Sequence, residues 1–249
     1  MPNLSTRQEV SLVRKSRPAS NKIIFISCEG QVTEEEYFKI LTTIFDGVKS
    51  KLCFVSVMGD ILAIPTNQRT TEQCSLLGKS KPWQLVEKIE TFKIEQDEKY
   101  EFSKHPDDEF WIIADVDDNT NNINLERWNE VFANREAKSY QCAISNPFFE
   151  VWLLLHHVDI VDEDFKYAVT DSQEYKATAH FRERLRNDAH APLKNQKHLN
   201  EIHYDIDKVR CAVQRAKQLD NAHEEWPHNL GSTVYLLVEK LIDIEDSMK

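Results

Sequence analysis

The sequence predicts an α/β fold in which a mainly parallel β-sheet is flanked by helices and followed by a helical C-terminal extension. Short runs of β-branched and aromatic residues alternate with segments of helical apolar spacing from residue 22 to about residue 160. Beyond that point the β-type runs fade and helical patterns remain. The chain of 249 residues is 41% hydrophobic, so it can bury a core of domain size.

The first strand is expected at residues 23–26, where the run IIFI is typical of a strand buried on both faces. It ends in Ser-Cys-Glu-Gly at residues 27–30. Thr33 and Glu36 have the spacing of a capping box, in which both side chains accept hydrogen bonds from backbone amides at a helix start. A helix is therefore expected from Thr33 to about Phe45.

A second strand is expected at residues 52–57, and a polar loop follows at residues 59–80. This loop is too long to be a simple connection. Pro82 suits the first turn of a helix that continues to about Gln96. A third strand, at residues 110–114, ends in two aspartates separated by a valine.

The fourth strand is expected at residues 140–144, after a helix at about residues 125–138. Pro147 then breaks the strand and starts a helix at residues 148–157. After about residue 160 only helices are expected, and the last of them is placed at residues 232–244.

These elements divide the chain into three parts. Residues 1–21 are expected to form a flexible basic arm, because lysines and arginines surround one short apolar patch. Residues 22–160 form the α/β domain, and residues 161–249 form a helical region with a basic surface.

The composition argues against several classes of protein. The formal net charge is −11, from 31 Lys and Arg against 42 Asp and Glu, which argues against nucleic-acid binding through bulk positive charge. The five cysteines form no Cys-x-x-Cys pair, and the five glycines form neither a Walker motif nor a dinucleotide-binding motif. Because neither a membrane-spanning stretch nor a signal-peptide segment is found, a soluble cytoplasmic protein is expected.

Three carboxylates follow strands of the expected sheet: Glu29 follows the first strand, and Asp115 and Asp117 follow the third. In an open α/β sheet, side chains at the carboxyl ends of strands face a shared crevice. Asp115 and Asp117 point to the same side of an extended chain, so the three acids could converge on one cation. Mg²⁺ suits such oxygen ligands and implies phosphoryl transfer. The alternative is that Asp-x-Asp only caps a helix or stiffens a turn.

Three segments carry a resemblance to a known family: FISCEGQVTEEEYF at 25–38, FWIIADVDD at 110–118 and SNPFFEVWLLLH at 145–156. Weaker agreement continues through GKSKPWQLVEKI at 78–89 and STVYLLVEKL at 232–241. In order and spacing these segments resemble the RloB-like family of Toprim-domain proteins. The resemblance implies a Toprim-like fold with a metal-dependent active site.

The resemblance also implies roles for individual residues. Glu29 matches the Toprim glutamate that acts as general acid or base, and Asp115 and Asp117 match the metal-binding Asp-x-Asp. Asp118 could be an additional ligand. Glu150 matches the acid of the family's Ser-Asn-Pro-x-x-Glu-x-Trp segment and is the one charge in an apolar helix, so it needs a metal, a basic side chain or a backbone donor as its partner. One-metal and two-metal mechanisms both stay open.

His156 occupies a family position at the end of the helix that carries Glu150. The helix dipole favours a protonated imidazole there, which could contact the scissile phosphate or act as an acid. Packing at the helix end is the alternative.

A basic segment offers a surface for nucleic acid. Residues 175–217 contain ten basic and five acidic side chains in an otherwise acidic chain. Tyr175, Phe181 and Tyr204 offer faces on which unpaired bases could stack. A solvated basic helix face is the alternative. The candidate nucleic-acid contacts, two of them in or beside the long loop, are Lys79, Lys81, Lys176, Arg182, Arg184, Arg186, Lys194 and Lys197.

The leading hypothesis is an endonuclease that depends on Mg²⁺ or Mn²⁺, with RNA such as tRNA slightly favoured over DNA as the substrate. The resemblance implies an antiviral or abortive-infection role, alongside a partner ATPase or a CRISPR-type defence system, and a homodimer is also considered. The alternative is a sensor or regulatory subunit that holds a metal–nucleotide signal without cleaving anything.

Overall fold

The computed structural model describes most of the α/β domain and of the C-terminal region, and the α/β class is confirmed. The predicted arm at residues 1–21 lies outside the described residues, as do Lys79, Asp117 and Asp118. The same holds for the predicted loop at 59–80 apart from Gln68. The described residues are 22–30, 32–55, 68, 81–116, 129–134, 139–167, 174–195, 197–220, 227 and 229–248.

The described strands form one sheet in the order β2-β1-β3-β4-β5. The first four are parallel to one another, and β5 runs antiparallel to β4 at the edge. The four parallel strands are those expected from the sequence. Their bounds are β1 Ile24–Cys28, β2 Leu52–Phe54, β3 Glu109–Asp115 and β4 Tyr140–Asn146, and β5 is Gly231–Ser232.

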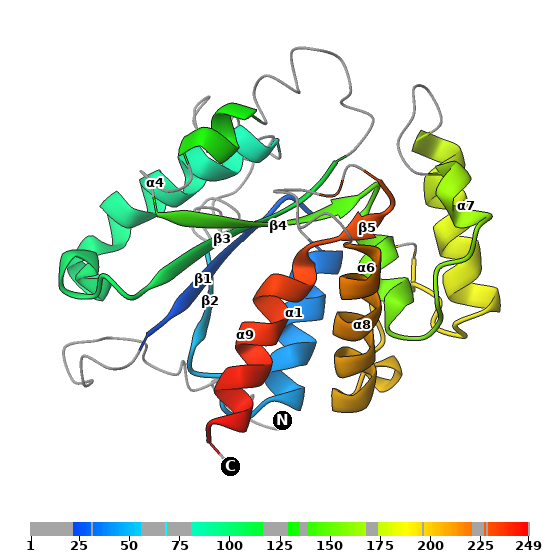
Figure 1. Cartoon of the computed structure of the whole chain (residues 1–249). Coiled ribbons are helices and arrows are strands. Elements are labelled where there is room, and N and C mark those ends of the chain that lie inside the picture. Colours follow the sequence, from blue (N-terminus) through cyan, green and yellow to red (C-terminus); the bar gives the residue numbers. More distant parts are fainter. Residues whose placement is uncertain are drawn as a thin grey trace.

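Helices cover both faces of this sheet (Figure 1): α4 lies on one face, and α1, α6, α8 and α9 lie on the other. Among the described helices, none combines the length and the apolar character needed to cross a membrane. The α-helices are α1 Thr33–Ile44, α4 Pro82–Tyr100, α6 Phe149–Leu155, α7 Glu174–Asn187, α8 Ile206–Leu219 and α9 Val234–Asp246. Short 3-10 turns are η3 Phe102–Lys104, η4 Asp164–Tyr167 and η5 Glu201–His203, and residues 129–134 are also helical.

The core is divided between the two faces of the sheet. Along β1, Ile24 and Ile26 pack toward α1 and α6, whereas Phe25 packs toward α4. Phe25 stacks on Phe110 of β3, with 4.9 Å between the ring centroids. Because side chains alternate between the faces of a strand, burial on both sides requires an unbroken apolar run. This is the physical reason that β1 and β3 were recognisable in the sequence.

The expectation that only helices follow residue 160 is wrong at β5. Ser232 pairs with Ser145 of β4, and their hydroxyl oxygens lie 3.0 Å apart. The Thr233 hydroxyl accepts a hydrogen bond of 2.8 Å from the amide of Ile144. A strand of two residues is too short to show a periodic pattern, and the edge of β4 creates it. The last helix accordingly begins at Val234 rather than at Ser232.

The predicted capping box is also wrong, although the helix begins at Thr33 as expected. The Thr33 hydroxyl donates a hydrogen bond of 2.8 Å to the carbonyl of Lys197. The Glu36 carboxylate accepts hydrogen bonds from the His198 ring, at 2.7 Å, and from the Leu199 amide, at 2.8 Å. Both side chains therefore connect the loop between α7 and α8 to α1. They bind this distant segment instead of the backbone amides at the start of their own helix.

Candidate active site at the carboxyl ends of the central strands

A cleft lies where the order of the sheet reverses. The chain passes from β1 to β2 on one side and later reaches β3 on the other, so the loops after β1 and β3 diverge. Such a switch point is where open α/β sheets form ligand crevices. The cleft has a volume of about 540 Å³ and is lined by Glu29, Gly30, Val32, Thr33, Glu34, Asp115, Phe148, Phe149, Glu150, Thr178, Arg182 and Lys197.

Glu29 and Asp115 lie at adjacent strand ends and are joined by a hydrogen bond. The Glu29 amide donates to the carbonyl of Ile113 at 2.8 Å, which continues the pairing of β1 with β3. The Asp115 amide in turn donates to the Glu29 carboxylate, with 3.2 Å between N and Oε2. The structure thus brings these two predicted site residues together at the carboxyl edge of the sheet.

Glu34, in the first turn of α1, is a cleft residue that the sequence reasoning missed. Its side chain is buried, with 6% of the residue exposed. Burial raises the pKa of Glu34 to about 7, and the charge of Glu150 acts in the same direction, against backbone hydrogen bonds at Glu34 and Gly30. The sequence does place Glu34 in the first turn of the helix that follows the first strand, which is a position where an acid can face the strand ends. The predicted capping box used only its neighbours Thr33 and Glu36.

Gly30→Ala is expected to lower the free energy of unfolding by about 1–3 kcal/mol, the usual cost of overpacking. A Cβ atom at residue 30 would lie 1.9 Å from Glu34 Oε2, so the buried carboxylate would have to move. Urea-induced unfolding measures the effect. Gly231→Ala is the matched control, because the nearest atom to a Cβ there is 3.5 Å away. Equal losses in both variants would contradict the close approach of Gly30 to Glu34.

Glu150, in the first turn of α6, has the basic partner that its burial requires. The residue is 8% exposed, and Arg182 Nε of α7 donates to Glu150 Oε1 at 2.8 Å. Both side chains line the cleft. Since an unpaired buried carboxylate is costly, this ion pair keeps a negative charge beside Glu34.

Lys88 of α4 is a second residue that the sequence reasoning missed. It is buried, and within the described part of the chain its ammonium group makes neither a hydrogen bond nor an ion pair. Burial lowers its pKa, against the charges of Cys28, Glu29 and Glu35, which raise it. Lys88 is therefore close enough to Glu29 for their charges to interact, although it does not line the cleft.

Comparison with known proteins gives a match to one family. Residues 24–241 match the family model described as RloB-like protein. This chain belongs to the RloB-like family. Neither the search of curated proteins nor the search of solved structures found a match. Every residue that lines the cleft of this RloB-like protein lies within the matched span.

In this RloB-like chain, His156 lies in the core instead of the cleft, and only 2% of it is exposed. Its Nε2 lies 3.0 Å from the Tyr37 hydroxyl, and its Nδ1 lies 2.9 Å from the Trp152 carbonyl. Burial lowers its pKa to about 3. The expected protonated imidazole is therefore wrong, because the loss of solvation outweighs the favourable helix dipole.

Two of the predicted nucleic-acid contacts, Arg182 and Lys197, line the cleft of this RloB-like chain. Lys176, Arg186 and Lys194 are exposed at the surface. Two others do not line the cleft: Lys81 is the N-cap residue that precedes α4, and Arg184 is largely buried. Lys79 lies outside the described residues.

Arg184 has a structural role. Its guanidinium pairs with the fully buried Asp164 and, through Nε at 2.8 Å, with Asp188. The expected stacking faces are also wrong at two positions, because Phe181 is fully buried and Tyr204 is 6% exposed. Tyr175 has no described side chain. Two of the three aromatic residues that were expected to stack on bases thus pack in the hydrophobic core instead.

The donor set of the cleft fits a hard divalent cation. Glu29, Glu34, Asp115 and Glu150 supply carboxylate oxygens, and a cation would offset both the burial and the nearby charge of Glu150 that raise the pKa of Glu34. In the described part of the chain, no group of three His, Cys, Asp or Glu side chains is arranged to hold a metal by itself. Mg²⁺ commonly takes one or two protein carboxylates and completes its shell with water and substrate phosphates, so the described acids suit that mode.

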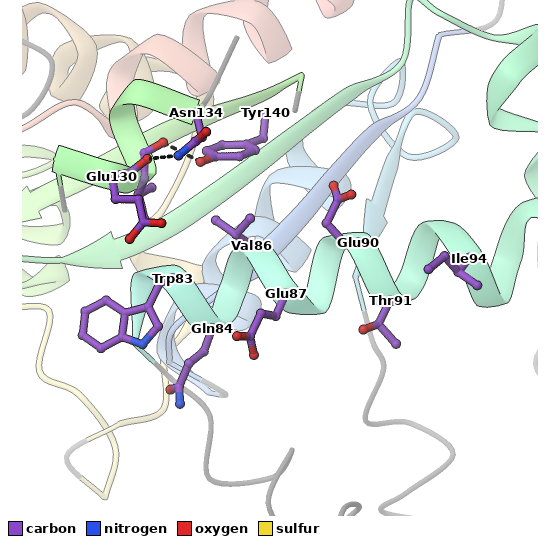
Figure 2. Close-up of a pocket in the computed structure, with 11 residues that line it drawn as sticks. Trp83, Gln84, Val86, Glu87, Glu90, Thr91, Ile94, Glu130, Asn134 and Tyr140 are labelled. Atoms are coloured by element: carbon purple, nitrogen blue, oxygen red, sulfur yellow. Dashed lines mark hydrogen bonds between the residues drawn. The ribbon is translucent and has the colours of Figure 1, made fainter. Parts of the chain in front are cut away.

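A larger pocket of this RloB-like chain, of about 800 Å³, lies on the other face of the sheet between α4 and residues 129–134. Figure 2 shows Trp83, Glu87 and Ile94 along α4, with Tyr140 on the opposite side. Its described lining contains three glutamates and neither lysine nor arginine. This charge disfavours phosphate, so the cleft at the strand ends remains the candidate active site.

Proposed function

We propose that this RloB-like chain is a metal-dependent endonuclease that hydrolyses phosphodiester bonds, with its active site in the cleft at the carboxyl ends of β1 and β3. One observation carries the proposal: four carboxylates line the same cleft as Arg182 and Lys197. The carboxylates suit a cation, and the two basic side chains suit the phosphates of a nucleic acid. The proposal includes a Toprim-like sheet, as the resemblance to that group of proteins implies.

Asp115 and Glu34 would hold the metal in this proposal, together with Asp117 and, as a further ligand, Asp118. When bound, Mg²⁺ or Mn²⁺ supplies a Lewis acid that polarises the scissile phosphate and lowers the pKa of a bound water. Asp115 is suited to this role because it ends β3 beside Glu29. Glu34 is suited to it because a nearby positive charge would stabilise its buried carboxylate in the ionised form.

Glu29 would transfer the proton. Its carboxylate is oriented by the hydrogen bond from the Asp115 amide, so it is held at the edge where water and substrate enter. A carboxylate fixed in this way can accept a proton from the attacking water and return it to the leaving oxygen. The nearby positive charge of Lys88 offsets part of the negative charge of Glu29.

Arg182 and Lys197 would position the substrate. Arg182 uses Nε for Glu150, which leaves its terminal nitrogens as donors for a phosphate at the mouth of the cleft. Lys197 lines the same cleft and would contribute a second cation. The exposed Lys176, Arg186 and Lys194 would extend this contact along the nucleic acid.

The proposed setting is antiviral or abortive-infection defence, with a partner ATPase or a CRISPR-type system supplying regulation. RNA, tRNA included, is the first substrate to test, because a toxic effector needs only a few essential RNA targets. The buried positions of Phe181 and Tyr204 remove the stacking argument for unpaired bases, so DNA stays in the same experiment.

The test is incubation of the purified protein with total tRNA, single-stranded RNA or plasmid DNA, each with EDTA, Mg²⁺ or Mn²⁺. We expect cutting that requires metal and is lost in the Asp115→Asn/Asp117→Asn variant. Asp243→Asn, which changes an exposed aspartate on α9, is the control and should cut like the wild type. Metal-dependent cutting that persists in the double variant would refute this active site. Tight binding of a metal–nucleotide complex without any cutting would favour the sensor alternative.

A further inference from the structure

A second pocket, of about 460 Å³, lies at the end of α6 opposite to the carboxylate cleft. Glu150 in the first turn of α6 faces the cleft, whereas His157, just after its last turn, lines this pocket. A helical rise of about 1.5 Å per residue puts the two sites roughly 10 Å apart along α6. Nothing in the proposed nuclease mechanism uses the second pocket.

Three imidazoles without hydrogen-bond partners face this pocket. The Nε2 atom of His157 is buried and has no partner in the described structure. His190, in the loop after α7, and His203, in η5, line the same space, and their rings make no hydrogen bond within the described part of the chain. Buried polar atoms are almost always hydrogen-bonded in proteins, so the Nε2 atom of His157, in a residue that lines the pocket, lacks a partner that a bound molecule or water would supply.

Two permanent cations on α8 complete the wall. Lys208 donates to the carbonyl of His203 at 3.1 Å and pairs with Asp205, with 3.4 Å between Nζ and Oδ2, and an ammonium group has three N–H donors, so one remains for a ligand. Arg215 donates through Nε to Asp159 at 2.6 Å and through Nη1 to the carbonyl of Leu155 at 2.7 Å. The guanidinium has five N–H groups, so donors remain for a ligand.

One acid also lines the pocket, but its charge is already engaged. Asp188 accepts a hydrogen bond of 2.8 Å from Nε of Arg184. Lys208 and Arg215 are paired in the same way, with Asp205 and Asp159, so among the residues that line the pocket two cations stand against one acid. Burial, together with the nearby Lys208, His203 and Arg215, lowers the pKa of His157 to about 4 against the opposing charge of Asp205. A positive field of this kind is relieved by a bound anion.

We propose that this pocket binds the phosphate group of a small phosphorylated molecule. A tetrahedral phosphate presents acceptors in several directions, and here donors converge from the end of α6, from the loop at 188–190, from η5 and from α8. The pocket volume of about 460 Å³ is larger than a phosphate ion, so it has room for an attached group as well. This site is independent of the proposed nuclease activity.

The test is isothermal titration of the full-length protein with inorganic phosphate and, separately, with AMP, in EDTA so that no metal is present. We expect saturable binding of one molecule per chain. Lys208→Met and His203→Leu should each weaken it about tenfold or more, because each removes a hydrogen-bond donor from the wall of the pocket. Lys217→Gln is the control: it removes the same charge from α8, at an exposed position paired with Glu239, and should bind like the wild type.

The outcomes separate the sources of binding. If AMP binds more tightly than phosphate, the pocket recognises a phosphorylated nucleoside; equal affinities mean that the phosphate group alone is recognised, and both results support the site. Absence of saturable binding to the folded wild-type protein overturns the proposal. Binding that is unchanged in both pocket variants but lost in Arg182→Gln would place the phosphate in the carboxylate cleft and also overturn it.

Discussion

Replacing Glu34 by glutamine is expected to raise the free energy of unfolding at about pH 8 by on the order of 3 kcal/mol. The same change should lower metal-dependent cleavage about 100-fold or more, because it removes a proposed metal ligand. Burial raises the pKa of Glu34 to about 7 from an ordinary value of 4.5. The folded protein therefore holds this carboxylate charged at alkaline pH only at a cost in stability.

The sign of the pH dependence follows from proton binding. Between about pH 4.5 and about pH 7 the folded state keeps a proton on Glu34 that the unfolded state has released. The contribution of Glu34 to the free energy of unfolding is thus highest below that window. It is lost as the pH rises through the window, and it stays lower above about pH 7. Glutamine does not titrate, so the variant should be more stable than the wild type at about pH 8 and nearly equal to it at about pH 5.

Urea-induced unfolding at the two pH values measures this effect, together with a cleavage assay in Mg²⁺. Glu35→Gln is the matched control, because Glu35 is a neighbouring, partly exposed glutamate that pairs with Lys39. It should change stability by less than about 0.5 kcal/mol. A Glu34→Gln variant that gains no stability at the higher pH would contradict the burial argument. One that gains stability but still cleaves normally would remove Glu34 from the active site.

Arg182→Met is expected to lower the free energy of unfolding by about 3 kcal/mol at about pH 8. The Glu150 carboxylate would remain buried without its guanidinium partner, and breaking a buried ion pair from one side costs about 3–5 kcal/mol. The lower end of this range applies because the Arg182 side chain is 30% exposed, so water screens part of the loss.

A double-mutant cycle with Glu150→Gln isolates this interaction by chemical denaturation. The double variant should recover most of the loss, since a neutral amide is less costly to bury than a lone charge. Arg186→Met, on the exposed surface of the same helix, should be nearly neutral. Strictly additive losses in the cycle would mean that the Arg182–Glu150 pair contributes nothing.

The sequence by itself determined the central sheet. The strands β1 and β3 are buried on both faces, so their apolar runs are unbroken and easily recognised. Because parallel strands end at a common edge, the acids that follow those two strands, Glu29 and Asp115, were expected to meet, and they lie in one cleft. Family membership was likewise readable from the three motif segments.

Tertiary structure decided which polar side chains face that cleft. Glu34, Glu35 and Glu36 are consecutive, and the docking of α1 against the strand ends turns Glu34 into the cleft and Glu36 toward the loop at 197–199. His156 shares a motif segment with Glu150, yet it is buried beneath Tyr37. The spacing of residues along a helix does not show which side chains face the cleft and which are buried in the core, because this depends on the segments that pack against the helix.

Pairings between distant segments were also decided by the tertiary structure. Glu150 and Arg182 are 32 residues apart and meet because α7 packs on α6. The two-residue strand β5 exists because the edge of β4 was available to it. The burial of a helix or strand is visible in the sequence as a periodic pattern of apolar residues. The distant residue that pairs with a charge or with a strand edge is not visible there, because it depends on the packing of the whole chain.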